Sequence, residues 1–131
     1  MAPEADQAPD RDGLGDLIGL EYLEAGPDEV RARVEVTDDL RQPAGLVHGG
    51  VFAVIAESMC SGATWLAVRG AGMSAMGQSH SAALLRPIAE GNVNAVARPR
   101  HRGRTTWVWD VEITDDEGRL CALVRMTVAV R

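Results

Sequence analysis

The longest apolar stretch of the chain lies in its middle, at residues 51–68. Apolar side chains there cover almost the whole circumference that a helix would have, which is the pattern of a helix buried on nearly every side. The stretch barely reaches membrane-spanning length and contains four polar residues, so it predicts a core helix and no membrane span. These residues are Glu57, Ser58, Ser61 and Thr64.

Strand patterns dominate the second half of the chain, with no further helix between them. The expected strands cover residues 76–86, 92–99, 105–114 and 120–130, and turn-forming residues separate them. Before the helix, Val30, Ala32 and Val34 alternate with charged residues, which predicts a strand, and a short helix is expected within residues 13–23. Consecutive strands without crossover helices predict an α+β fold in which an antiparallel sheet wraps around one long helix.

Length and composition predict a single domain. The chain has 131 residues, 46% of them hydrophobic, which is enough for one core and too little for two ordinary domains. We expect this domain to cover residues 13–131. Residues 1–12 are rich in Ala, Pro and acidic residues and lack the basic start and apolar run of a secretory signal, so they predict a disordered leader.

Charge and cysteine content narrow the classes of function. A formal net charge of −6 argues against general binding of nucleic acid or of an anionic membrane surface. The two cysteines, Cys60 and Cys121, lie in apolar stretches and have neither a metal-ligand spacing nor a disulfide-framework pattern. They indicate reduced, buried thiols, and we expect a cytoplasmic protein without a bound metal.

Glu57 is the strongest single candidate for chemistry. A lone carboxylate in an apolar helix is expected to be buried, and burial makes a carboxylate a stronger base or nucleophile. The plainer alternative is a solvent-facing or arginine-paired glutamate. Ser61 and Thr64 follow at helical spacing and extend a polar stripe. For Ser61 we favour a functional role, and for Thr64 a hydrogen bond to its own helix backbone.

A second candidate is the sequence His48-Gly49-Gly50 at the start of the helix. Glycines there leave backbone N–H groups open to a substrate at the positive end of the helix dipole, which suits an oxyanion. The alternative is a tight turn with a histidine cap. The position of Glu57, two helical turns further on, favours the oxyanion site.

The positive charges concentrate in one cluster between two predicted strands, at Arg98, Arg100, His101, Arg102 and Arg104. Such a cluster suits the phosphates of a nucleotide-bearing ligand. Taken by itself, however, the cluster has a solvated turn whose arginines balance nearby acids as its default interpretation.

The motifs QPAGLVHGG at residues 42–50 and AES at residues 56–58, followed by Ser61, resemble the hotdog-fold thioesterases of the 4-hydroxybenzoyl-CoA thioesterase and PaaI-like superfamily. The glutamate in AES resembles the branch that contains the Arthrobacter-type enzyme and the enterobactin and menaquinone-pathway thioesterases. The PaaI branch usually has aspartate there. The resemblance extends from about Leu14 to Val130, and only the leader lies outside it.

The resemblance implies a role for each matching residue. Glu57 corresponds to the nucleophile or general base, and the Gly49 N–H to the group that polarises the thioester carbonyl. His48 and Gln42 correspond to supports of that group, and Ser61 to the side chain that orients the attacking water. No metal or separate cofactor is implied, because coenzyme A is part of the substrate.

The resemblance also implies how coenzyme A binds and how the chains assemble. The nucleotide is expected near Arg86 and a turn that comprises His101, Arg102, Gly103, Arg104, Thr105 and Thr106. Each site is expected across a subunit interface, in a homotetramer of paired dimers. One departure is Leu84, because several relatives have histidine at this position, and the nearby His80 is not a simple replacement.

The function that follows is hydrolysis of an aromatic or medium-sized acyl-CoA to free acid and coenzyme A. Two alternatives come from other classes. One is a non-catalytic acyl-CoA-binding hotdog module, for which Glu57 would be dispensable. The other is a hotdog hydratase or dehydratase, whose Asp/His or His/Glu motifs are not found in this sequence.

Overall fold

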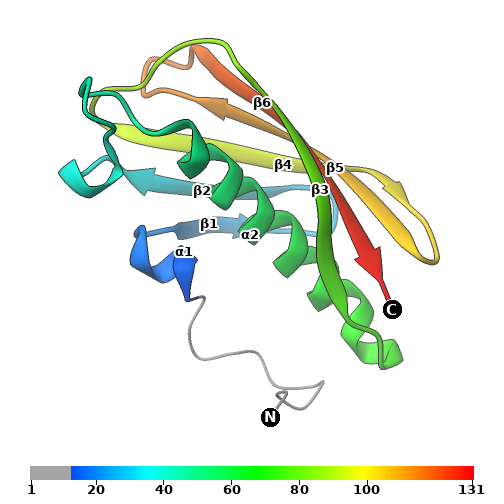
Figure 1. Ribbon diagram of the computed structural model, residues 1–131. Coiled ribbons are helices and arrows are strands. Elements are labelled where there is room, and N and C mark those ends of the chain that lie inside the picture. The colour runs from blue at the N-terminus through cyan, green and yellow to red at the C-terminus, as the bar shows by residue number, and fades with distance from the viewer. Residues whose placement is uncertain (1–12) are drawn as a thin grey trace.

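Helix α2 (Gly49–Val68) lies in the curve of a six-stranded antiparallel sheet (Figure 1). The structure is a computed structural model that describes residues 13–131, so the expected leader lies outside the described residues. The strand order is β1-β2-β4-β5-β6-β3. The strands are β1 (Glu21–Ala25), β2 (Val30–Glu35), β3 (Ala75–Leu84), β4 (Asn92–Arg102), β5 (Thr106–Thr114) and β6 (Leu120–Val130), and the short helical elements are α1 (Leu14–Leu17), η1 (Asp38–Leu40) and η2 (Arg69–Ala71).

The core forms between α2 and the concave face of the sheet. Ile55, Met59 and Cys60 of α2 are fully buried. They pack with alternate residues of the strands, and β2 shows the alternation clearly, with every second side chain buried. Burial of each large aliphatic side chain stabilises the fold by about 1.5–3 kcal/mol. The predicted α+β arrangement of a sheet around one long helix is therefore confirmed.

Two elements differ from the sequence prediction. Strand β1 was not separated from the short helix before it, because all its side chains are exposed and it shows no buried alternation. Backbone pairing with β2 forms this strand. Strand β4 continues past Pro99 to Arg102. Strand β2 pairs with β4 only as far as Ala97, so one side of β4 is open beyond that point. A proline on an open side costs no hydrogen bond between strands.

Strand β3 is the open edge of the sheet. It pairs only with β6, and its residues 76–84 are all exposed. A long, exposed edge strand offers unpaired backbone groups to another chain. The opposite edge, β1, is half as long, with 5 residues against 10 in β3.

Within residues 13–131, one helical segment, Gly49–Ala71, is long and apolar enough to cross a membrane by length and composition alone. This segment is α2 with the short η2 turn, and the sheet wraps around α2 (Figure 1). The core explains the apolar face that α2 turns to the sheet, but the prediction of a helix buried on nearly every side is wrong for the single chain, in which 39% of the apolar stretch is buried.

Thr64 is the buried polar residue that ties α2 to the sheet. Its hydroxyl donates to the Cys60 carbonyl oxygen at 2.7 Å and accepts from the Trp109 indole N–H at 2.9 Å. The first bond is the link to its own helix backbone that the sequence favoured. The second satisfies a buried donor of β5, so Thr64 has a structural role at this point of the helix.

We expect Thr64→Val to destabilise the protein by about 1–3 kcal/mol, because it leaves the Trp109 N–H buried without an acceptor. Thr64→Ser is the matched control, since it keeps the hydroxyl and removes one methyl group, at a cost of about 1 kcal/mol. Urea unfolding of the three proteins measures the difference. Equal stability of Thr64→Val and the wild type would contradict this role.

Candidate functional site

A short loop that its own hydrogen bonds close leads into the N-terminus of α2. Arg41 pairs with Val47 in an isolated bridge, and the Gln42 side-chain oxygen accepts from the Ala44 N–H at 2.8 Å. His48 is the N-cap, and its Nδ1 accepts from the Gly50 N–H at 2.9 Å. His48 and Gln42 therefore support the loop and the first turn of the helix, which places the Gly49 N–H at the positive helix end.

Leu84 lies against Gly49. A Cβ atom added to Gly49 would approach the Leu84 Cδ1 to 2.7 Å, so the leucine at the end of β3 contacts the first residue of the helix. Leu84 is 58% exposed. Leu84 therefore provides an apolar wall beside the backbone N–H that was predicted to polarise a carbonyl.

Glu57 is exposed, and the prediction that it is buried is wrong for the single chain. Its carboxylate leaves the apolar core and lies on β3, where a Cβ atom on Gly77 would approach the Glu57 Oε1 to 2.5 Å. Only glycine leaves room for the carboxylate there. Gly77 was not among the predicted site residues, although a glycine inside a strand pattern is a known sign of a bulge or a close approach.

Ser61 lies one turn beyond Glu57 on α2. Its hydroxyl oxygen is buried and makes no hydrogen bond with the described residues. Thr64, by contrast, is fully engaged with Cys60 and Trp109. The predicted polar stripe therefore divides into a structural end at Thr64 and an end at Glu57 and Ser61. At that end the Glu57 side chain is exposed, and the Ser61 hydroxyl is buried without a partner among the described residues.

Gly49 and Glu57 are too far apart on one helix to act on the same carbonyl carbon. Eight residues separate them, which is about 12 Å along the helix axis. A carbonyl that accepts from one group and is attacked by the other needs both within about 3 Å. The two-turn spacing, which favoured a shared site when only the sequence was considered, instead indicates that Gly49 and Glu57 of one chain do not act on the same carbonyl.

The residues expected to bind coenzyme A also lie at two ends of the chain's sheet. The turn between β4 and β5 lies level with Met76, since Thr106 pairs with Ala129 and Ala129 pairs with Met76. Arg86 follows the opposite end of β3, beyond Leu84. The length of β3 separates them by about 25 Å. One chain therefore does not bring Arg86 and the β4–β5 turn together, and the expectation of one nucleotide site across a subunit interface stays a prediction.

Several arginines of the positive cluster already have acidic partners. Arg98 pairs with Glu29 at 2.8 Å, and Arg102 pairs with Asp28 at 2.9 Å and lies over the Trp107 ring. These exposed pairs are the plainer alternative considered for this cluster. The turn itself is fixed by the bond from the Gly103 N–H to the Thr106 oxygen, and by the bond from the Val130 N–H to the Thr105 oxygen.

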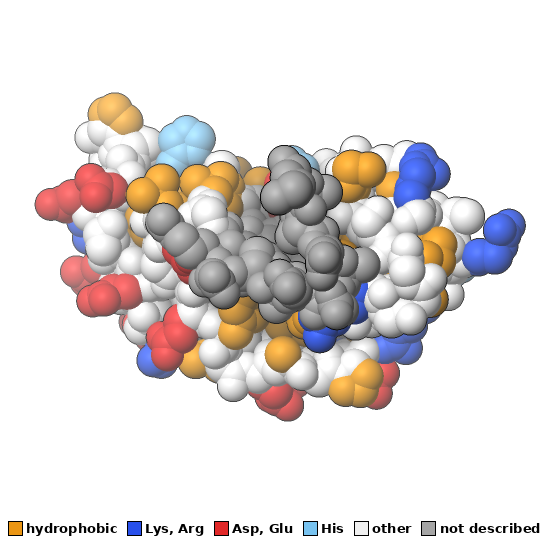
Figure 2. Space-filling model, turned by 90° about the horizontal axis from the view of Figure 1, so that it is seen from below, with side chains coloured by type: hydrophobic (Ala, Val, Ile, Leu, Met, Phe, Trp, Pro, Cys, Tyr) orange, Lys and Arg blue, Asp and Glu red, His pale blue; other side chains and the backbone are white. Residues whose placement is uncertain are grey.

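Charge is nevertheless divided between the two ends of the molecule. Figure 2 shows arginines gathered on the right, the side on which Figure 1 places the β4–β5 hairpin, and acidic side chains on the left. On the convex face, Arg125 donates to Asp110 and is the main cause that holds the pKa of that carboxyl below its usual value. His101 and Arg104 are exposed in the β4–β5 turn.

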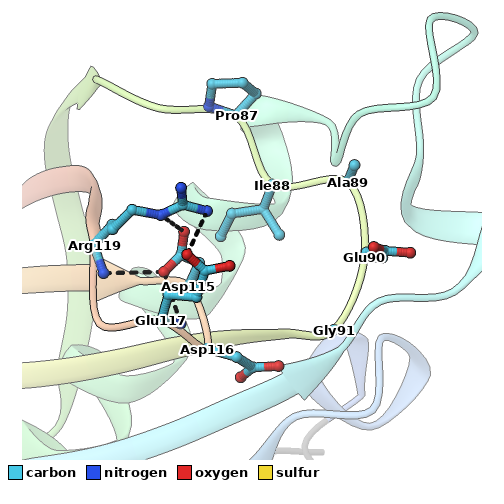
Figure 3. Close-up of a pocket in the computed structure, with 9 residues that line it drawn as sticks. All are labelled: Pro87, Ile88, Ala89, Glu90, Gly91, Asp115, Asp116, Glu117 and Arg119. Carbon is cyan, nitrogen blue, oxygen red and sulfur yellow. Dashed lines mark hydrogen bonds and ion pairs between the residues drawn. The ribbon is translucent and has the colours of Figure 1, made fainter.

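A pocket of about 480 Å³ lies at the acidic end, between the loop after β3 and the β5–β6 turn (Figure 3). Its acids serve the turn: Asp115 pairs with Arg119, and hydrogen bonds from Asn94 first, and from Asn92, lower the pKa of Asp116. A pocket rich in carboxylates repels phosphates, so it is separate from the predicted chemistry. Its lining residues are Pro87, Ile88, Ala89, Glu90, Gly91, Asp115, Asp116, Glu117 and Arg119.

Both cysteines are buried, free thiols, as predicted. Burial raises the pKa of the Cys60 thiol far above its usual value, which makes it a poor nucleophile. Among residues 13–131, no group of three or more His, Cys, Asp or Glu side chains is arranged to hold a metal ion. The reactive groups that remain open are those along α2 and β3.

The sequence matches the family model described as the thioesterase superfamily over residues 44–122. This range begins within the loop before α2 and ends within the first residues of β6, so it contains α2, β3, β4 and β5. The match therefore covers both Gly49 and Glu57.

Two similar proteins carry names that state an activity. The proofreading thioesterase EntH of Cronobacter turicensis is 36% identical over 99% of this chain and 94% of that protein. The 1,4-dihydroxy-2-naphthoyl-CoA hydrolase of Escherichia coli K12 is 36% identical over 90% of this chain and 88% of that protein. A crystal structure of a mutant thioesterase PA1618 from Pseudomonas aeruginosa has a TM-score of 0.86 and 34% identity, and covers 98% of each chain. The chain therefore belongs to the thioesterase superfamily and is a thioester hydrolase.

Proposed function

We propose that this thioester hydrolase cleaves an acyl-CoA, with Glu57 as the nucleophile or general base and the Gly49 N–H as the group that polarises the carbonyl. The observation that carries the proposal is the position of the Glu57 carboxylate, which leaves an apolar helix and lies on Gly77 at the open edge of the sheet. The capped N-terminus of the same helix supplies the oxyanion donor.

The site is completed by a second copy of the chain. The separation of about 12 Å between Gly49 and Glu57 requires that the two groups acting on one thioester come from different chains. Antiparallel pairing of β3 with the β3 of a second copy, about a twofold axis, brings the Leu84 end of one strand to the Gly77 end of the other. Gly49 of one copy then lies near Glu57 of the other.

The same pairing accounts for the divided coenzyme-binding set. It brings Arg86 of one copy to the end of the assembly where the β4–β5 turn of the other copy lies. The nucleotide would then contact Arg86 from one chain and residues 101–106 from the other. The family resemblance further implies that two such dimers form a tetramer.

Hydrolysis follows one of two routes with the same groups. In one, Glu57 removes a proton from water, the resulting hydroxide adds to the carbonyl carbon, and the C–S bond breaks to release the coenzyme A thiolate, which takes up a proton. In the other, a Glu57 oxygen bonds to the carbonyl carbon and expels the thiolate, and water then opens the anhydride. The Ser61 hydroxyl, which is buried without a partner among the described residues, is proposed to orient that water once substrate binding gives water access to it.

The acyl group is proposed to be aromatic or of medium size. A relative at 36% identity is named for a naphthoyl-CoA substrate, and the AES motif with Glu57 supports the glutamate branch of the family. Leu84 beside Gly49 adds an apolar contact next to the scissile bond. The expected location remains the cytoplasm, where acyl-CoA substrates are made.

We expect Glu57→Ala to reduce kcat for thiol release by roughly 10²–10⁴-fold, the usual contribution of a catalytic acid or base. The assay uses a thiol-reactive dye and a panel of aryl- and alkyl-acyl-CoAs. Glu57→Gln keeps the size of the side chain and should be equally inactive, which separates loss of the carboxylate from loss of packing. Full activity of either variant would refute the role of Glu57.

The same experiment tests the binding-module alternative. A module that only binds acyl-CoA would release no thiol from any substrate, and both Glu57 variants would bind acyl-CoA as the wild type does. Calorimetric titration with a non-hydrolysable acyl-CoA thioether measures that binding. Thiol release by the wild type, together with its loss in both Glu57 variants, excludes a purely binding function.

We expect Gly77→Ala to reduce kcat about tenfold or more. The new Cβ atom would lie within 2.5 Å of the Glu57 Oε1, so the carboxylate must move away from its present position. Gly70→Ala is the matched control, since no atom lies within 4 Å of its added Cβ. Steady-state kinetics with circular dichroism to confirm folding measures the effect. Unchanged kcat in Gly77→Ala would show that the carboxylate does not act from this position.

A further inference from the structure

A β-bulge in β3 determines which side chains of this strand face α2. Gly77 pairs with Val128 and Ser79 pairs with Thr127, so Gln78 is an extra residue without a partner on β6. The extra residue reverses the alternation of side chains along the rest of the strand. Without it, Ser79 and Ser81 would face the helix. With it, the helix-facing residue is His80.

The pairing with β6 confirms this orientation. Residues directly opposite each other in an antiparallel pair project to the same side of the sheet. His80 is opposite Met126, Ala82 is opposite Val124, and these two residues of β6 are buried in the core beneath α2. His80 therefore shares the helix-facing side of β3 with Gly77 and Leu84.

His80 is the next helix-facing position after Gly77, on which the Glu57 carboxylate lies. Successive positions on one side of a strand are about 7 Å apart, and an imidazole side chain is long enough to reduce that distance to a hydrogen bond. Both side chains are exposed, and neither has a hydrogen bond or ion pair with another described residue. The facing residues of β6 are apolar. Glu57 is the one charged side chain of α2, so it is the charged partner that this helix can offer to His80.

We propose that His80 is a positioning residue that donates a hydrogen bond to the Glu57 carboxylate and holds it in its catalytic orientation. This inference rests on the proposed function of Glu57. The hydrogen bond forms by a rotation of the two free side chains when substrate fills the space between α2 and β3. Catalytic hydrogen bonds are commonly long in the free enzyme and become short in the complex with substrate.

Four single variants test the role. His80→Phe keeps an aromatic ring but has no donor, and we expect kcat to fall about tenfold or more with little change in KM, because only the orientation of the attacking group is lost. His80→Ala should behave in the same way. His80→Gln restores an N–H donor and should recover most of kcat. Ser81→Ala, the next residue on the opposite side of the strand, should match the wild type.

A second measurement separates positioning from a purely structural role. In the Glu57→Ala background, His80→Phe should cause no further loss of kcat, since the group that it positions is already absent. Thermal melting of each variant checks that it folds. Wild-type kcat in His80→Phe, or an equal further loss in the Glu57→Ala background, would overturn the inference.

The outcomes for Glu57 and His80 are distinguishable. If Glu57→Ala is inactive while His80→Phe is fully active, the proposed function holds and the positioning role is wrong. If the wild type releases no thiol from any acyl-CoA in the panel, the proposed function fails and the role of His80 fails with it. If both variants lose kcat and His80→Gln recovers it, both proposals are supported.

Discussion

The packing of one rigid helix against the concave face of the sheet determines the rest of this structure. A broad buried face fixes α2 against the sheet, so the distance between its N-terminus and Glu57 is set by helix geometry. That distance exceeds what one thioester carbonyl allows. The proposal that a second copy of the chain completes the site therefore follows from the length of the helix itself.

Strand β3 is the second element on which the proposed site depends. It is the open edge through which copies of the chain would pair, and its helix-facing side carries Gly77, His80 and Leu84. Leu84 contacts the first residue of the helix, and Gly77 makes room for the Glu57 carboxylate. A single bulge residue, Gln78, determines which side chains of β3 lie on this side.

The sequence predicted most of the fold because its signals were local. The apolar stretch in the middle of the chain identified α2, and alternation identified β2. It did not separate β1, whose exposed side chains have no alternation to detect. The motifs also identified Gly49 and Glu57 as candidates, but not the exposure of Glu57. An apolar neighbourhood in sequence does not reveal that the carboxylate leaves the core beside a strand distant along the chain.

The remaining site features depend on contacts that sequence spacing does not encode. The ion pairs of Arg98 and Arg102 arise from acids about 70 positions earlier in the chain. The separation of Arg86 from the β4–β5 turn depends on the direction of β3 in the sheet. Both features depend on the register of the strands, which the sequence does not specify.

The most direct test of the central claim, that Gly49 and Glu57 act on a thioester from different chains, is complementation between two inactive variants. Gly49→Pro removes the N–H at the first position of the helix, where proline is common, and His48 already has the extended backbone that precedes proline, with φ −60° and ψ 131°. The added Cβ atom displaces only the end of the flexible, exposed Leu84 side chain. Co-expressed in equal amounts with Glu57→Ala, Gly49→Pro should restore about a quarter of wild-type activity, because a quarter of randomly assembled sites then combine an intact Gly49 with an intact Glu57. Activity no higher than that of the separate variants, in assemblies that contain both chains, would contradict the claim.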